Sequence, residues 1–356
     1  MRRLGAAVIA VLMVVVALWI RDRIDDDGGS GGGTGDGRAL RVRCALELEA
    51  ACGELADQGV DTTVEDAGTT AAALVAVPNT QRSDVGFDAW LVTAPWPEIV
   101  DVQRRENGLD PVFGATTGPV ARSPLVLAVR TDRNDVLEAT PECGGTVSWR
   151  CVGELAGRPW DTIGGQQSWR SVRPAHGDPT RSATGLAVLS QATSEFLDQE
   201  AYSRNDLELN PEYADWLAGL ERAVPPSAFS SRSPFLEMVQ QLPTATYDVV
   251  GTTEAEAGPA LADAARDRRR QVTLLYPDPV ISTDVVLATV TGTDAGAVAD
   301  LAGSDDLRDD LAETGWRVPG RRRADGVRTR PVLRPGSGLP DAGVLVALQD
   351  TWETSR

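Results

Sequence analysis

The sequence of 356 residues contains no lysine and a single histidine, so all 34 of its basic residues are arginines. They are outnumbered by 52 acidic residues, which gives a formal net charge of −18. A chain this acidic, with no basic stripe, lacks the charge that neutralises phosphates, which argues against nucleic-acid binding. It also lacks the several long apolar runs of a polytopic membrane protein. Its hydrophobic content of 42 % is nevertheless that of a folded protein, and its length predicts about two domains.

Cysteine is scarce, and the four residues form two pairs with the same spacing, Cys44-x7-Cys52 and Cys143-x7-Cys151. Four cysteines allow three pairings, and the repeated short spacing favours two local disulfides. Disulfides persist in oxidising compartments, so the pattern agrees with export from the cytoplasm. The alternative is four unrelated buried thiols. A metal site is not expected, because there is no Cys-x2-Cys and only one histidine.

One apolar run is present, from Leu4 to Ile20, and its seventeen residues nearly cross a hydrocarbon core of about 30 Å. Arg2 and Arg3 precede it, which predicts a cytoplasmic amino end and an exported remainder. Because the run ends in Trp19-Ile20-Arg21 rather than in small residues, we expect an uncleaved anchor over residues 1–24. A cleaved signal peptide is the alternative. Residues 25–37 are rich in glycine and are expected to form a flexible tether.

Short β-type runs alternate with helix-length segments in the rest of the chain. This alternation predicts an α/β fold with a largely parallel sheet. The expected strands are 40–42, 62–64, 84–87, 124–130, 246–250, 271–276 and 284–290. The expected helices include 47–58, 70–77 and 184–197, and further helices begin after Asn210 and Ser233, each of which is a capping residue followed by proline. The segment 321–338 is rich in Arg, Gly and Pro and is expected to be a surface loop.

Five segments in a fixed order resemble a known family. They are VEDAGTT (64–70), RSPLVLAV (122–129), DPTRSATGL (178–186), YDVVGTTEA (247–255) and LYPDPV (275–280). The order resembles that of the type II extracellular solute-binding proteins of bacterial ABC importers, particularly the molybdate/sulfate-like branch. It is similar most of all to the solute-binding half of chains that continue into a von Willebrand A domain. The metal motif of that second domain, Asp-x-Ser-x-Ser, does not occur in this sequence.

The resemblance implies a type II periplasmic-binding-protein fold of two α/β lobes joined by two crossing strands. Lobe 1 would combine residues 38–125 and 280–356, lobe 2 would be residues 126–279, and the crossings would fall near 125–130 and 271–285. It also implies a ligand held between the lobes by helix N-termini and hydroxyl groups, with no cofactor. The ligand would be a small molecule or an oxyanion.

Six residues of the matching segments are the expected ligand-binding residues. Ser182 and Thr184 begin a helix whose free N–H groups could hold an anion, with Arg170, Arg173 and Arg181 in the loop before it. The others are Thr69, Thr70, Ser123 and Thr253. The alternative for each is ordinary helix capping beside solvated charges. Glu254, beside Thr253, is interpreted as a helix N-terminal carboxylate.

One residue departs from the family pattern. The first strand of the family often ends in a serine-rich ligand loop, whereas this chain has Cys44-Ala45-Leu46-Glu47 there. Glu47 would repel an anion if it faced the cleft. Enzymatic activity is not expected, because His176, Asp178 and Ser182 lie too close in sequence for a catalytic triad. Trp90, Trp96, Trp160 and Trp169 are expected in the core rather than in the cleft.

The sequence therefore predicts a membrane-tethered, extracytoplasmic solute-binding protein with a single membrane pass, which serves an ABC permease. The alternative is a ligand-free surface module for interaction or sensing, which partners a protein with a von Willebrand A-type domain. Convergence of Thr69, Ser123, Ser182 and Thr253 on one hollow would favour ligand binding. A cleft filled by Glu47 or Arg181 would favour the interaction module.

Overall fold

A computed structural model describes residues 39–356, which form one compact unit. The predicted anchor and tether, residues 1–24 and 25–37, lie outside the described residues. Among the helices that are described, none combines the length and the apolar character needed to cross a membrane.

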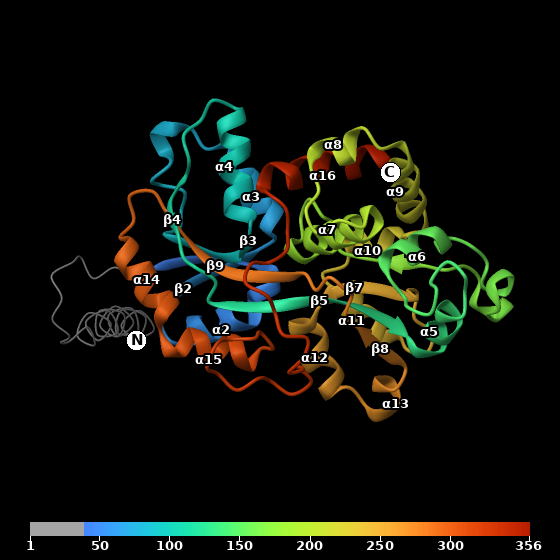
Figure 1. Cartoon of the computed structure of the whole chain (residues 1–356). Coiled ribbons are helices and arrows are strands. Elements are labelled where there is room, and N and C mark those ends of the chain that lie inside the picture. Colours follow the sequence, from blue (N-terminus) through green and yellow to red (C-terminus); the bar gives the residue numbers. More distant parts are fainter. Residues whose placement is uncertain (1–38) are drawn as a thin grey trace, which may run out of the picture. The chain divides into compact units, whose positions relative to one another are not determined.

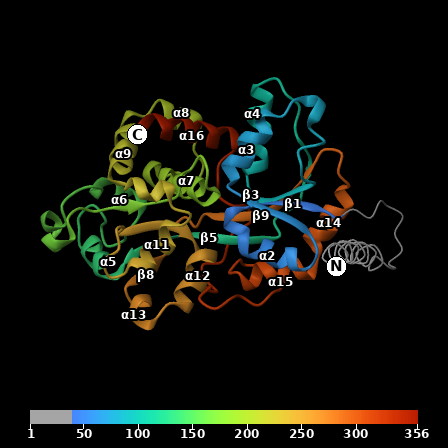
Figure 2. The same cartoon turned by 180° about the vertical axis from the view of Figure 1, so that it is seen from behind.

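Strands run through the middle of the unit and helices cover both faces (Figures 1 and 2). The strands are β1 (Arg41–Ala45), β2 (Asp61–Glu65), β3 (Ala89–Ala94), β4 (Phe113–Thr116), β5 (Ala121–Arg130), β6 (Pro174–Ala175), β7 (Val249–Thr253), β8 (Val272–Leu275) and β9 (Ser282–Val290). The first α-helices are α2 (Glu49–Asp57), α3 (Ala67–Ala76), α4 (Trp96–Glu106), α5 (Thr131–Glu138), α6 (Trp149–Leu155), α7 (Ala183–Leu197), α8 (Arg204–Glu208) and α9 (Pro211–Ala223). They are followed by α10 (Pro226–Ser230), α11 (Pro234–Gln241), α12 (Glu254–Asp263), α13 (Arg266–Arg269), α14 (Ala295–Gly303), α15 (Asp305–Glu313) and α16 (Ala342–Ser355). Short 3-10 helices are η1 (Leu46–Leu48), η2 (Asn79–Gln81), η3 (Trp160–Ile163) and η4 (Gln167–Trp169).

The strands form one mixed sheet in the order β2-β1-β3-β9-β5-β7-β6, with β4 also paired to β9 and β8 to β5. The prediction of a largely parallel sheet is wrong. Only β1 with β2, β1 with β3 and β6 with β7 are parallel, whereas every pairing of β5 and β9 is antiparallel. An alternation of strands and helices predicts parallel pairing only where a helix connects two strands that become neighbours in the sheet. β5 and β9 lie between two sets of strands, β1–β4 on one side and β6–β8 on the other, and each is antiparallel to its neighbours.

The chain passes between two sets of strands at β5. Residues 121–124 pair with β9 beside β3, β1 and β2, whereas residues 125–130 pair with β7 and β8. The chain passes between the sets again after β8, where it enters β9. These two passages occur where the resemblance places the crossing strands.

Several local predictions agree with the described elements. Asn210 and Ser233 cap α9 and α11 with their side chains, and each is followed by proline. The strand expected at 84–87 is wrong, because those residues are irregular, with bends at Val85 and Gly86, and the strand begins at Ala89. Both local disulfides are present, Cys44 with Cys52 and Cys143 with Cys151.

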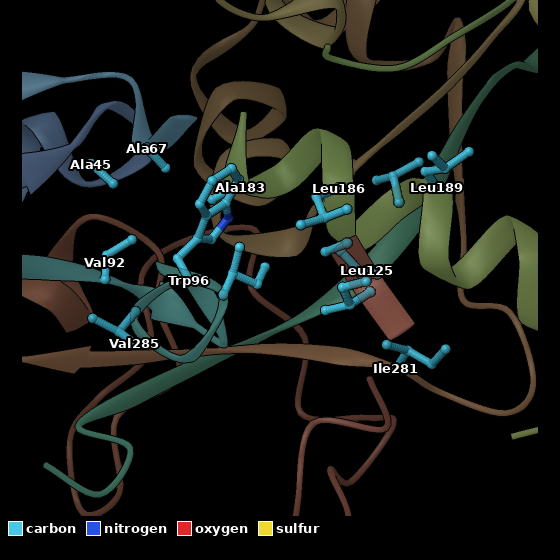
Figure 3. Close-up of a cluster of buried hydrophobic side chains, with 14 of the residues drawn as sticks. Ala45, Ala67, Val92, Trp96, Leu125, Ala183, Leu186, Leu189, Ile281 and Val285 are labelled. Atoms are coloured by element: carbon cyan, nitrogen blue, oxygen red, sulfur yellow. The ribbon is translucent and has the colours of Figure 1, made fainter. Parts of the chain in front are cut away.

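One hydrophobic core continues across both sets of strands. Figure 3 shows part of it, where Ala67 of α3 and Trp96 of α4 share the cluster with Ala183 and Leu186 of α7. All four side chains are buried. Trp90 and Trp160 are completely buried as well, as expected of core residues. Helices α3 and α4 are therefore joined to α7 by one buried apolar cluster.

Candidate functional site

The chain segments that follow β1 and β2 face the segments that begin α7 and α12. We call this zone the junction; it comprises residues 46–70 on one side and residues 178–184, 229–236 and 253–256 on the other. β1 and β2 are parallel, so η1 and the start of α3 extend from the same edge of the sheet. Ligands of α/β proteins commonly bind beyond this carboxyl edge of parallel strands.

Backbone groups touch directly across the junction. The Gly68 N–H donates to the Arg181 carbonyl oxygen over 2.9 Å. A Cβ atom at Gly68 would lie 1.9 Å from the Thr180 carbonyl oxygen, so only glycine fits there. Beside this contact, Arg181 Nη2 donates to Asp66 Oδ2 over 2.8 Å. The junction is therefore closed at this side.

Glu47 occupies the start of α7. Its Oε1 atom accepts a hydrogen bond from the Ser182 hydroxyl over 2.8 Å and one from the Thr184 N–H over 3.1 Å. Ser182 also caps α7, because its Oγ accepts from the Gly185 N–H over 3.0 Å. The donors expected to hold an anionic ligand thus hold a carboxylate of the chain itself. Glu47 therefore faces the junction, which is the orientation in which it would repel an anion.

The other expected ligand-binding residues form hydrogen bonds with groups of the chain itself. The buried Thr70 hydroxyl donates to Glu65 Oε2 over 2.8 Å, and the exposed Thr69 hydroxyl donates to Asp66 Oδ2 over 3.3 Å. Ser123 is completely buried, and its Oγ accepts from the Ala255 N–H at the start of α12 over 2.9 Å. The Thr253 hydroxyl caps the same helix at Glu256. Their roles toward a ligand remain predictions.

A cavity of about 360 Å³ lies in the junction, with walls from both sides. Of the expected residues, Thr184 and Thr253 line it, whereas Ser182 lines a second hollow of about 340 Å³. Glu47 lines both. The wall of the first cavity is made by Leu46, Glu47, Leu48, Glu49, Ala50, Ala51, Thr184, Arg232, Ser233, Leu236, Thr253, Ala255, Glu256, Thr314 and Trp316. We call it the junction cavity.

Sequence analysis missed several residues of this wall. Glu49, Arg232, Glu256 and Trp316 belong to it, and none of them was a candidate. Glu256 follows Glu254 by two residues, and the sequence offers no signal to say which of the two carboxylates turns toward the cavity. Glu254 instead lies buried and paired with Arg317, so its role is more than that of a helix N-terminal carboxylate. Nowhere in residues 39–356 do histidine, cysteine and carboxylate side chains gather in a group that could hold a metal ion.

The single histidine, His176, lies just before the junction loop 178–182 and is buried. Its Nδ1 lies 2.8 Å from the Gly177 carbonyl oxygen, and its Nε2 lies 2.9 Å from Glu221 Oε1. Both partners are acceptors, so only the doubly protonated ring can donate to both. Burial alone lowers the pKa of His176, but the charge and hydrogen bond of Glu221, with the Gly177 carbonyl, raise that pKa above its ordinary value.

We expect the ring of His176 to stay protonated above the ordinary pKa of about 6.5. Because the folded pKa is raised, the contribution of this charge to the free energy of unfolding is complete below about pH 6.5 and is lost as pH rises through the folded pKa. Imidazole ¹⁵N NMR of the full chain checks this without assignment, since there is one histidine. A ring that is neutral at pH 6.5 in the folded protein would contradict it. His176→Gln should remove this part of the pH dependence of unfolding.

A scan against protein-family models finds no match for this chain, and a search of curated proteins finds none either. Solved structures do match along most of its length. The periplasmic binding protein AfuA from Actinobacillus pleuropneumoniae, with exogenous fructose-6-phosphate bound, is 14% identical over 89% of this chain and 96% of its own, with a TM-score of 0.53.

Two further structures are similar to the same extent. A periplasmic thiamin binding protein is 12% identical over 92% of this chain and 99% of its own, with a TM-score of 0.55. The ferric binding protein from Campylobacter jejuni is 9% identical over 89% and 96%, with a TM-score of 0.53. All three are described as binding proteins. At these identities the likeness establishes the fold: this chain has the fold of the type II periplasmic solute-binding proteins.

Proposed function

We propose that the chain is an extracytoplasmic solute-binding protein that captures a small ligand between two lobes for an ABC-type permease. The lobes are those expected from the sequence, residues 38–125 with 280–356 and residues 126–279. Residues 1–24 would hold the protein at the cell membrane, and residues 25–37 would be a flexible tether between this anchor and the folded part.

The junction cavity is the observation that carries this proposal. Its volume of about 360 Å³ falls within the range of small-molecule sites. One wall comes from η1 and α2, and the opposite wall comes from the starts of α7, α11 and α12. Movement of the lobes about β5 and the β8–β9 connection would open and close a cavity of this kind.

A second candidate function has an observation of its own. Glu47 already accepts hydrogen bonds at the start of α7, and the ion pairs of Arg181 with Asp66 and of Arg232 with Glu49 join the two sides of the junction. A cleft filled in this way is what the sequence analysis expected of an interaction or sensing module, partnered by a von Willebrand A-type protein. The cavity that remains beside Glu47 favours ligand capture.

A thermal-shift screen of the full chain, kept in mild detergent and unreduced, tests the choice. The panel contains oxyanions, sugars, amino acids, peptides and organic cations. A ligand at about 100 times its dissociation constant adds about 2.7 kcal/mol to the free energy of unfolding, or roughly 5 °C. A flat panel on folded protein would contradict ligand capture and favour the interaction module.

Two tryptophan variants on one helix place the binding. Ala50 is exposed on α2 and lines the junction cavity, whereas Ala56 is exposed on the same helix outside its wall. Ala50→Trp should fill the cavity and abolish the ligand-induced rise, and Ala56→Trp should keep it. An equal rise in both variants would place the ligand elsewhere.

A further inference from the structure

The charged groups in the wall of the junction cavity are mainly carboxylates. Glu47, Glu49 and Glu256 face one cation, Arg232. Arg232 Nη2 lies 2.7 Å from Glu49 Oε2, so these two charges neutralise each other. Glu47 and Glu256 are left as the net charge of the wall.

The helix start that could attract an anion is already satisfied. The Thr184 N–H and the Ser182 hydroxyl both donate to Glu47 Oε1. An oxyanion ligand would have to displace that carboxylate and would then stand between two negative side chains. Like charges in a partly buried site repel strongly, because little water screens them. The cavity is therefore unfavourable for the ligand class that the molybdate/sulfate resemblance implies.

The two ion pairs described above for the junction, Arg181 with Asp66 and Arg232 with Glu49, include neither Glu47 nor Glu256. Glu47 Oε2 is buried and has no hydrogen-bond partner within residues 39–356. Burial, and to a lesser extent the charge of Glu47, raise the pKa of Glu256, while hydrogen bonds from the Ser233 and Thr252 hydroxyl groups lower it. A buried carboxylate oxygen without a donor is costly, and a ligand that supplies an N–H or a positive charge would remove that cost.

Beside its charged and hydroxyl-bearing residues, the wall has a large apolar part. Leu46, Leu48, Leu236 and Trp316 contribute to it. Apolar walls around two carboxylates match a molecule that carries a cationic head on a hydrocarbon body, and an aromatic side chain is itself a favourable neighbour for a cation. A hydrated metal ion would gain little from such walls.

We infer that the ligand of the junction cavity is a small organic cation, an amine or quaternary ammonium compound, bound by Glu47 and Glu256. This inference rests on the proposed function. The solute would be of this chemical class, and Glu47 would stand in place of the family's serine-rich loop because its carboxylate binds the positive charge of the solute.

Isothermal titration of the full chain, in detergent and at constant ionic strength, compares choline and putrescine with sulfate, phosphate and glucose. We expect binding of at least one cation and of no anion. Glu47→Gln should weaken that binding at least tenfold, because the amide keeps an oxygen for Ser182 and Thr184 but loses the charge. Glu256→Gln should do the same and carries the test if Glu47→Gln does not fold. Glu54→Gln removes an equal charge from an exposed position of α2 outside the cavity and should leave the affinity unchanged.

The possible outcomes separate this inference from the proposed function. Binding of an anion or of glucose, with no cation bound, would overturn the inference and leave solute capture standing. Cation binding that is equal in Glu47→Gln and Glu54→Gln would also overturn it, since the charge of Glu47 would then play no part. If nothing in this panel or in the wider thermal-shift panel binds, the proposed function itself fails.

Discussion

Replacing Gly68 with alanine should hold the two sides of the junction apart and weaken ligand binding at least tenfold. The new Cβ would lie 1.9 Å from the Thr180 carbonyl oxygen and 2.7 Å from Arg181 Cα. Both are backbone atoms, so no side-chain rotation relieves the clash. Gly68 lies in the first turn of α3 with ordinary helical backbone, and alanine is itself a better helix former than glycine. The variant should therefore fold and fail to close.

Solution X-ray scattering and hydrogen exchange measure this failure directly. We expect a larger radius of gyration and faster exchange over residues 46–51 and 178–185, because opening separates Ala67 and Trp96 from Ala183 and exposes their apolar surface. Gly219→Ala is the matched control, since Gly219 lies within α9 and a Cβ there meets no atom within 4 Å. Scattering and exchange that match the unsubstituted protein would show that the Gly68–Arg181 contact does not govern closure.

Glu254→Ala should lower the free energy of unfolding by about 3–5 kcal/mol, the usual cost of breaking a buried ion pair from one side. Glu254 is completely buried, and its oxygens accept from Arg317 Nε over 2.6 Å and from Arg317 Nη2 over 2.9 Å. The Tyr276 hydroxyl donates to it over 2.5 Å and the Arg328 N–H over 3.0 Å. Removing the carboxylate leaves all of these donors without their acceptor.

Urea unfolding of three variants tests whether the buried ion pair of Glu254 and Arg317 stabilises the fold. Glu254→Leu combined with Arg317→Leu should be less destabilised than Glu254→Ala, because neither partner is then left buried and charged. Glu49→Ala breaks the exposed pair with Arg232 and should cost less than about 1 kcal/mol. A loss for Glu254→Ala as small as that for Glu49→Ala would contradict a structural role for the buried pair.

The expected loop 321–338 contacts Arg317, the partner of Glu254, and its composition did not predict this contact. It contains no regular element, as its composition predicted. Its carbonyl groups nevertheless accept hydrogen bonds from arginines outside the loop: Arg317 Nη1 donates to the Pro331 carbonyl, and Arg122 Nη1 donates to the Arg334 carbonyl over 2.9 Å. The composition of a loop predicts that it is irregular but not which buried groups it satisfies.

Features that depend on neighbours in the sequence could be predicted. Asn210 and Ser233 cap helices because a capping side chain bonds to N–H groups only three residues away. The two disulfides join cysteines eight residues apart, within reach of a single turn and helix. The order of the five motifs predicted the fold, because it reflects the order in which strands and helices follow one another along the chain.

The direction of strands and of side chains could not be predicted in the same way. The sequence places Glu47 at the end of the first strand, yet its bonds to Ser182 and Thr184 span about 135 residues. Glu254 and Arg317 are 63 residues apart and meet in the interior. Antiparallel pairing of β5 and β9 likewise follows from the way the chain passes between two sets of strands.

The sequence alone thus determined many of the strands and helices, two of the helix caps, the disulfides and the class of fold, since each depends on local spacing or on the order of elements. Only the tertiary structure decided that Glu47 occupies the start of α7, that Glu254 is buried with Arg317, and that Thr184 and Thr253 line a common cavity while Ser123 and Thr70 do not. Those outcomes depend on which long-range contacts exclude water, and no short stretch of sequence contains both partners of such a contact.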